Sequence, residues 1–118
     1  MKNSILADKS VDFAVRIVKF YKYLCDEKKE YVLSKQILRS GTSIGANIRE
    51  SQNAQSGADF INKLGIALKE ADETEYWLEI MTKSKIINES QVEKLTLDLH
   101  EIIAMLISSI KTAKNNKS

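Results

Sequence analysis

Residues 39–50, RSGTSIGANIRE, decide the fold of this chain, because they hold two of its four glycines. A Walker-type phosphate loop follows a strand and needs a glycine followed by Lys and Ser/Thr, whereas alanine and asparagine follow Gly45. Apolar side chains instead continue through both glycines at the spacing of a helix, at Ile37, Ile44 and Ile48. The stretch therefore predicts the interior of a helix and argues against a phosphate-binding enzyme.

Glycine inside a helix costs about 1 kcal/mol relative to alanine, so two of them should have a structural purpose. Small side chains let a partner helix approach closely, which predicts helix packing or assembly through Ser40, Gly41, Ser43, Gly45, Asn47 and Ser51. An asparagine on such a face must be hydrogen-bonded and can fix the register of a helical assembly. Recognition of a ligand or partner is the alternative role for Asn47.

Four amphipathic segments account for most of the 118 residues, and the chain contains no proline. We expect helices at about 8–28, 33–54, 58–84 and 89–114, joined by short connections. Short connections place successive helices antiparallel. The prediction is an all-α protein, a single 1–118 domain folded as an antiparallel up-down four-helix bundle.

The first segment is apolar on two adjacent faces, so it should touch more than one neighbour. One stripe contains Val11, Ala14, Val18, Tyr21 and Cys25, and the other Phe13, Ile17, Phe20 and Leu24. Asp8 or Ser10 is expected to cap its start, and Asn88 or Ser90 to cap the fourth helix.

Catalytic and metal-binding patterns are missing from the sequence. With one histidine and one cysteine, the chain can form neither an intramolecular disulfide nor a multi-cysteine zinc site. A bundle di-iron site needs Glu-x-x-His, but Leu97 stands three residues before His100. No apolar run is long enough to cross a membrane. We expect a cytoplasmic protein without enzymatic activity, cofactor, metal or membrane partner.

Charge is unevenly distributed along the chain. Residues 1–49 carry ten basic and five acidic side chains, residues 50–101 five and eleven, and residues 102–118 three lysines and no acid. A basic surface on the first two helices could bind nucleic-acid phosphates through Arg16, Lys19, Lys22, Lys35, Arg39 and Arg49. Alternatively, the basic and acidic segments neutralise each other across helix or subunit contacts.

Much of the chain resembles one family, the four-helix-bundle proteins encoded by intervening sequences within bacterial 23S ribosomal RNA genes. The most specific part is Arg39-Ser40-x-x-Ser43-Ile44-x-Ala46-Asn47-Ile48-x-Glu50. Asp59-Phe60 and Ala67-Leu68-Lys69-Glu70-Ala71-x-Glu73-Thr74 follow it.

The resemblance implies more than the residues do by themselves. The family is similar in fold to the accessory variability determinant of diversity-generating retroelements, a homopentamer that binds nucleic acid and a reverse transcriptase. The resemblance therefore implies that this chain forms a ring-like homo-oligomer, most simply a pentamer, that binds RNA or DNA. The alternative is a protein-interaction adaptor that docks a partner such as a polymerase or reverse transcriptase.

Overall fold

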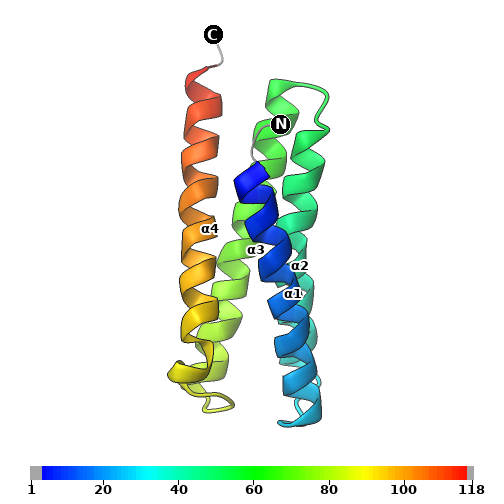
Figure 1. Ribbon diagram of the computed structural model, residues 1–118, viewed down its shortest axis with the longest axis vertical. Helices are drawn as coiled ribbons and strands as arrows, with labels where there is room; N and C mark the ends of the chain where they lie inside the picture. The colour runs from blue at the N-terminus through cyan, green and yellow to red at the C-terminus, as the bar shows by residue number, and fades with distance from the viewer. Residues whose placement is uncertain (1–3, 117–118) are drawn as a thin grey trace.

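The computed structural model describes residues 4–116 and forms a four-helix bundle about 50 Å long and 20 Å across. The helices are α1 (Ser4–Asp26), α2 (Leu33–Gln52), α3 (Gly57–Lys83) and α4 (Glu89–Asn115). They run alternately down and up (Figure 1). The all-α bundle predicted from the sequence is confirmed, and the ends of the expected 1–118 domain, residues 1–3 and 117–118, lie outside the described residues.

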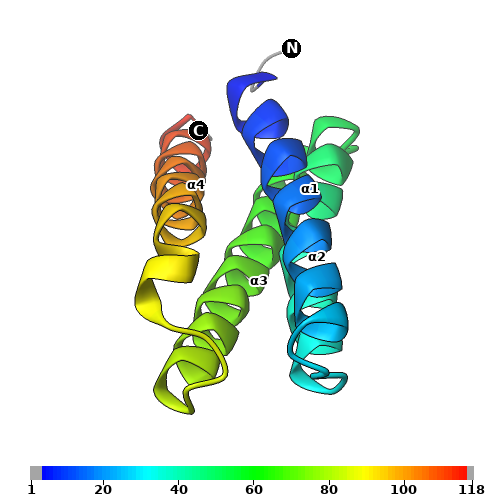
Figure 2. The ribbon, with the colours of Figure 1, turned by 60° about the horizontal axis from the view of Figure 1, so that its bottom comes forward.

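The helices pack mainly against their neighbours in the chain. The interface between α2 and α3 is the most extensive and that between α1 and α4 the smallest. Figure 2 shows α1 lying along α2 on one side of the bundle, with α4 on the other side of α3. The bundle therefore consists of an α1–α2 layer and an α3–α4 layer, held together chiefly through α2 and α3.

Helix α1 starts earlier than the sequence analysis predicted. It begins at Ser4, so neither Asp8 nor Ser10 is a cap. Leu6 is buried in the core, which gives the extra turn something to pack against. Ser10 is buried inside the helix, where its hydroxyl donates to the carbonyl of Ala7 at 2.7 Å. The other helix boundaries fall within two residues of those expected.

Side-chain caps define where α3 and α4 begin. The Ser56 hydroxyl accepts a hydrogen bond from the Asp59 amide at 3.0 Å, and Asp59 places a carboxylate in the first turn of α3. Asn88 and Gln91 form a capping box on α4, as the prediction of an Asn88 cap required. These local signals end the α2–α3 turn at Ser56 and the α3–α4 turn at Asn88.

The end of α3 closes with a hydrogen-bond pattern that normally uses glycine. The Ile86 amide donates to the Met81 carbonyl at 3.0 Å and the Lys85 amide to the Thr82 carbonyl at 3.1 Å, a Schellman motif. Lys85 occupies its left-handed position, with φ of 66°. A side chain with a Cβ is disfavoured in that conformation.

One apolar core runs the length of the bundle. On α2, α3 and α4 the buried positions follow the predicted stripes, including Ile44, Leu64 and Leu99, each with no exposed surface. On α1 the core face is Phe13, Ile17 and Leu24, the second of the two stripes. The first stripe does not enter the core at Val11 and Val18, which are 45% and 37% exposed.

Gly41 and Gly45 face α1. A Cβ on Gly41 would stand 2.8 Å from Cγ1 and 2.9 Å from Cγ2 of Ile17, which is fully buried. A Cβ on Gly45 would meet the Ser10 hydroxyl at 3.1 Å. The missing side chains therefore make room for α1 of the same chain.

None of the helices in residues 4–116 is both long and apolar enough to cross a membrane.

Gly41→Ala should destabilise the fold by about 1–3 kcal/mol, because the added methyl group overlaps Ile17 in a packed core. Gly65→Ala is the matched control, since a Cβ at this helical position meets nothing within 4 Å. It should stabilise the protein by about 0.5–1 kcal/mol. Chemical denaturation of both variants measures the difference; equal stability of the two would contradict the close approach at Gly41.

Lys85→Gly should stabilise the protein by about 0.5–1 kcal/mol, because glycine adopts the left-handed conformation without steric cost. Thermal unfolding would show a rise of a few degrees. Lys69→Gly, at an exposed position in the interior of α3, is the control and should destabilise by about 1 kcal/mol. A loss of stability in Lys85→Gly would show that the Schellman geometry is not retained in solution.

Candidate nucleic-acid interface

The six predicted phosphate-binding residues lie on two helices but do not form one patch. Arg16, Lys19 and Lys22 are on α1; Lys35, Arg39 and Arg49 are on α2. Lys35 and Arg49 are 14 residues apart on one helix, or about 21 Å along its axis. Ion pairs separate them further: Arg16 and Arg39 are paired with carboxylates, and the other four are outside the ion pairs of residues 4–116.

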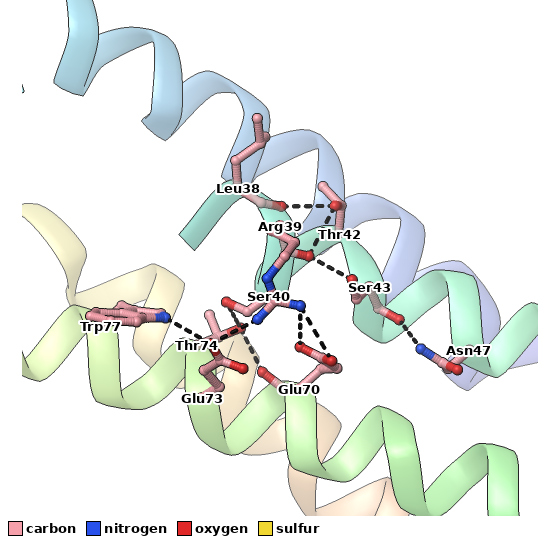
Figure 3. A network of polar contacts seen from close by, with 10 residues as sticks. All are labelled: Leu38, Arg39, Ser40, Thr42, Ser43, Asn47, Glu70, Glu73, Thr74 and Trp77. Atoms are coloured by element: carbon pink, nitrogen blue, oxygen red, sulfur yellow. Dashed lines mark hydrogen bonds and ion pairs between the residues drawn. The ribbon is translucent and has the colours of Figure 1, made fainter. Parts of the chain in front are cut away.

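Arg39 is held by two glutamates of α3 (Figure 3). Its guanidinium lies 3.2 Å from a carboxylate oxygen of Glu70 and 2.7 Å from one of Glu73. Trp77 donates its indole N–H to the same Glu73 oxygen at 3.2 Å. The arginine holds the pKa of Glu73 below its usual value, and the tryptophan hydrogen bond adds to that effect. Arg39 thus closes the outer edge of the α2–α3 interface.

Ser40 and Thr74 form the buried part of the same interface. Their hydroxyls are hydrogen-bonded at 2.9 Å, and the Thr74 hydroxyl also contacts the Glu70 carbonyl at 2.8 Å (Figure 3). Both residues are fully buried. Ser40 therefore packs α2 against α3, whereas Gly41 and Gly45 pack α2 against α1.

The remaining predicted packing residues bond within their own helix. Asn47 donates its side-chain amide to the Ser43 carbonyl at 2.9 Å, and Ser43 donates its hydroxyl to the Arg39 carbonyl at 2.6 Å. Ser51 is buried and donates to the Ile48 carbonyl at 2.6 Å. A role for these residues in assembly between chains stays a prediction.

Arg16 belongs to a polar seam between α1 and α4. It forms an ion pair with Asp98, Lys9 pairs with Glu101 at 3.1 Å, and the Tyr23 hydroxyl accepts from the Gln91 amide at 2.7 Å. The α1 members are seven residues apart, so they lie on one side of that helix. Arg16 is therefore engaged in closing the bundle.

Lys19, Lys22 and Lys35 are exposed, and no carboxylate in residues 4–116 forms an ion pair with them. The turn between α1 and α2 adds Lys28 and Lys29, which are also exposed and outside those pairs. We call these five the hairpin lysines. Sequence reasoning left Lys28 and Lys29 out of the site, although their position between two basic helix ends was a usable signal.

One carboxylate of the hairpin is already occupied by backbone. Glu30 accepts hydrogen bonds from the amides of Leu33 at 3.0 Å and Ser34 at 2.7 Å, which satisfies free N–H groups at the start of α2. The backbone amides of α2 therefore partly balance the charge of Glu30, and the neighbouring lysines remain free to bind an anionic ligand.

A second surface feature is a groove of about 640 Å³ on the outer side of α3 and α4. Leu78, Val92 and Leu97 supply its apolar lining, and four glutamates supply its charge: Glu75, Glu79, Glu89 and Glu93. His100 lies 2.5 Å from Glu75, and Lys83 lies 3.9 Å from Glu79. Glu75 and Glu79 are four residues apart and so share one face of α3, and α4 brings Glu89 and Glu93 beside them.

The described residues contain no cluster of three or more His, Cys, Asp or Glu side chains arranged to hold a metal ion.

Comparisons with known proteins identify the family. The family model described as 23S rRNA-intervening sequence protein matches residues 2–108. A crystal structure of a protein of unknown function from the S23 ribosomal protein family of Bacteroides thetaiotaomicron VPI-5482 is 62% identical, with a TM-score of 0.91. That match covers 94% of this chain and 99% of the other. No curated protein matches the chain. With a nearly full-length match in sequence and in fold, this four-helix bundle belongs to the 23S rRNA-intervening sequence protein family.

Proposed function

We propose that this protein is a non-enzymatic RNA-binding module that acts as a homo-oligomer and contacts the phosphate backbone through the hairpin lysines. The proposal rests on one observation: some of the basic residues are paired with carboxylates and others are not. Arg16 and Arg39 are paired with carboxylates of other helices, whereas the five hairpin lysines are exposed, lie outside the ion pairs, and are on or near the α1–α2 turn.

The chemistry of the hairpin suits a phosphate backbone. Exposed ammonium groups on flexible stems act as mobile point charges and need no fixed geometry to neutralise phosphate. Binding of this kind does not depend on base sequence, because phosphate contacts carry no direct sequence information. The family description names 23S rRNA, and on that ground the proposal takes RNA rather than DNA as the ligand.

Oligomerisation is part of the proposal because one hairpin is a weak site. Asp26 and Glu27 offset part of the lysine charge in each chain. Several hairpins on one assembly would bind the same RNA together, and avidity can exceed the affinity of a single site by about 10²–10⁴-fold. A ring with its hairpins on one rim would present such a surface.

The test replaces the lysines of the turn and the start of α2. Lys28→Ala/Lys29→Ala/Lys35→Ala should weaken binding to a structured RNA, and each lost contact should lower the slope of log affinity against log salt by about 1. Fluorescence anisotropy at salt concentrations from about 50 to 200 mM measures both quantities.

Two controls define the outcome. Lys111→Ala/Lys114→Ala removes two exposed lysines near the end of α4 and should leave the salt slope unchanged. Arg39→Ala should lower stability without changing the slope, because its guanidinium is occupied by Glu70 and Glu73. Equal binding by the triple variant and the wild type, or no binding at low salt, would refute the proposal. Nuclease-resistant capture of a polymerase or reverse transcriptase would favour the adaptor alternative.

A further inference from the structure

Helix α1 exposes a row of valines that the bundle does not cover. Val11, Val15 and Val18 are 45%, 49% and 37% exposed, and spacings of four and three place them on one side of the helix. Lys22 continues the row four residues later and is also exposed. We call these four residues the valine row. Contiguous exposed apolar residues rimmed by charge are typical of an interaction surface.

The acidic groove between α3 and α4 is a second uncovered surface. Leu97 is 61% exposed on its wall, beside buried Leu78 and Val92. The four glutamates outnumber the single lysine of the lining. The groove therefore combines an apolar centre with negative charge, whereas the valine row combines an apolar centre with a cation.

The two surfaces lie on different sides of the molecule. On α1, Arg16 faces α4 and Ile17 faces α2 and the core, which leaves the valine row on the outer side of the α1–α2 layer. The groove lies on the outer side of the α3–α4 layer. Figure 2 shows α1 with α2 on one side of the bundle and α4 on the other. Because the surfaces are separate, one chain can use both at once.

The valine row and the acidic groove also lie at the same level along the long axis of the bundle. The contacts Arg16–Asp98 and Tyr23–Gln91 set the level of α1 relative to α4. Val15 is next to Arg16 and Leu97 is next to Asp98, so these two apolar residues lie at one level. Lys22 is next to Tyr23 and therefore lies at the level of Gln91. In the sequence of α4, Gln91 stands between Glu89 and Glu93.

We propose that the valine row of one copy docks in the acidic groove of the next, with the long axes of the two bundles side by side and pointing the same way. This inference rests on the self-association in the proposed function and assigns the surfaces that produce it. In that arrangement Val15 meets the partner copy's groove at the level of Leu97, and Lys22 meets its glutamates. Different surfaces joined head to tail form a ring when the rotation closes.

This arrangement would also organise the RNA-binding ends. Because neighbouring copies point the same way, every α1–α2 turn lies at the same end of the assembly. Lys22 is the one hairpin lysine in the valine row, while the lysines of the turn and of the start of α2, Lys28, Lys29 and Lys35, stay on the rim.

The test blocks one surface at a time. Val15→Glu places a carboxylate against the acidic groove, and Leu97→Glu places one against the valines; both sites are exposed helix positions where glutamate is a good helix former. Each variant should keep wild-type helicity by circular dichroism and lose assembly by light scattering. Val32→Glu, at a 71% exposed position in the α1–α2 turn, is the control and should assemble as wild type.

Mixing the two blocked variants distinguishes head-to-tail pairing from symmetric pairing. The intact groove of Val15→Glu should bind the intact valine row of Leu97→Glu, and growth should stop at a dimer of twice the 13.4 kDa chain. Symmetric use of either surface would instead leave one of the single variants self-associated. Failure of the mixture to dimerise, assembly by either variant alone, or a monomeric wild type would overturn the inference.

The RNA titration separates this inference from the proposed function. Head-to-tail dimers in the mixture without RNA binding would refute the RNA-binding function and keep the interface. RNA binding by an oligomer that still assembles in both blocked variants would refute the interface alone.

Discussion

The approach of α1 to α2 at Gly41 determines how the rest of the bundle is arranged. Ile17 reaches into the space left by the missing side chain, so the two helices lie closer than side chains at that position would permit. This contact turns the Phe13–Ile17–Leu24 side of α1 inward and the valine row outward.

The rules that predict α2, α3 and α4 fail for α1, for a physical reason. A helix with one apolar stripe has one way to bury it, and the stripes through Ile44, Leu64 and Leu99 all enter the core. Helix α1 has two adjacent stripes, and periodicity cannot rank them. The choice depends on the glycines of α2, which accept Ile17 but leave no comparable place for Val18.

The candidate site was less accessible from sequence than the fold, because charges are neutralised by residues far apart in the chain. Arg39 meets Glu70 and Glu73 across the α2–α3 interface, and Arg16 meets Asp98 between the first and last helices. Both arginines are among the phosphate ligands predicted from the sequence, with neutralisation between basic and acidic segments as the alternative. The structure shows neutralisation for these two arginines, which are paired with carboxylates of other helices, whereas the lysines of the turn are outside the ion pairs of residues 4–116.

The polar seam and the valine row determine what the proposed assembly would add to the contacts of α1. The contact of α1 with α4 is the smallest between neighbouring helices and includes ion pairs and a tyrosine–glutamine hydrogen bond. Exposed ion pairs add little stability, whereas burial of apolar surface contributes about 25 cal/mol per Å². Covering Val11, Val15 and Val18 in a neighbouring groove would therefore hold α1 more firmly than its contacts with α4 do. Assembly would then stabilise the same hairpin that the proposed RNA surface uses.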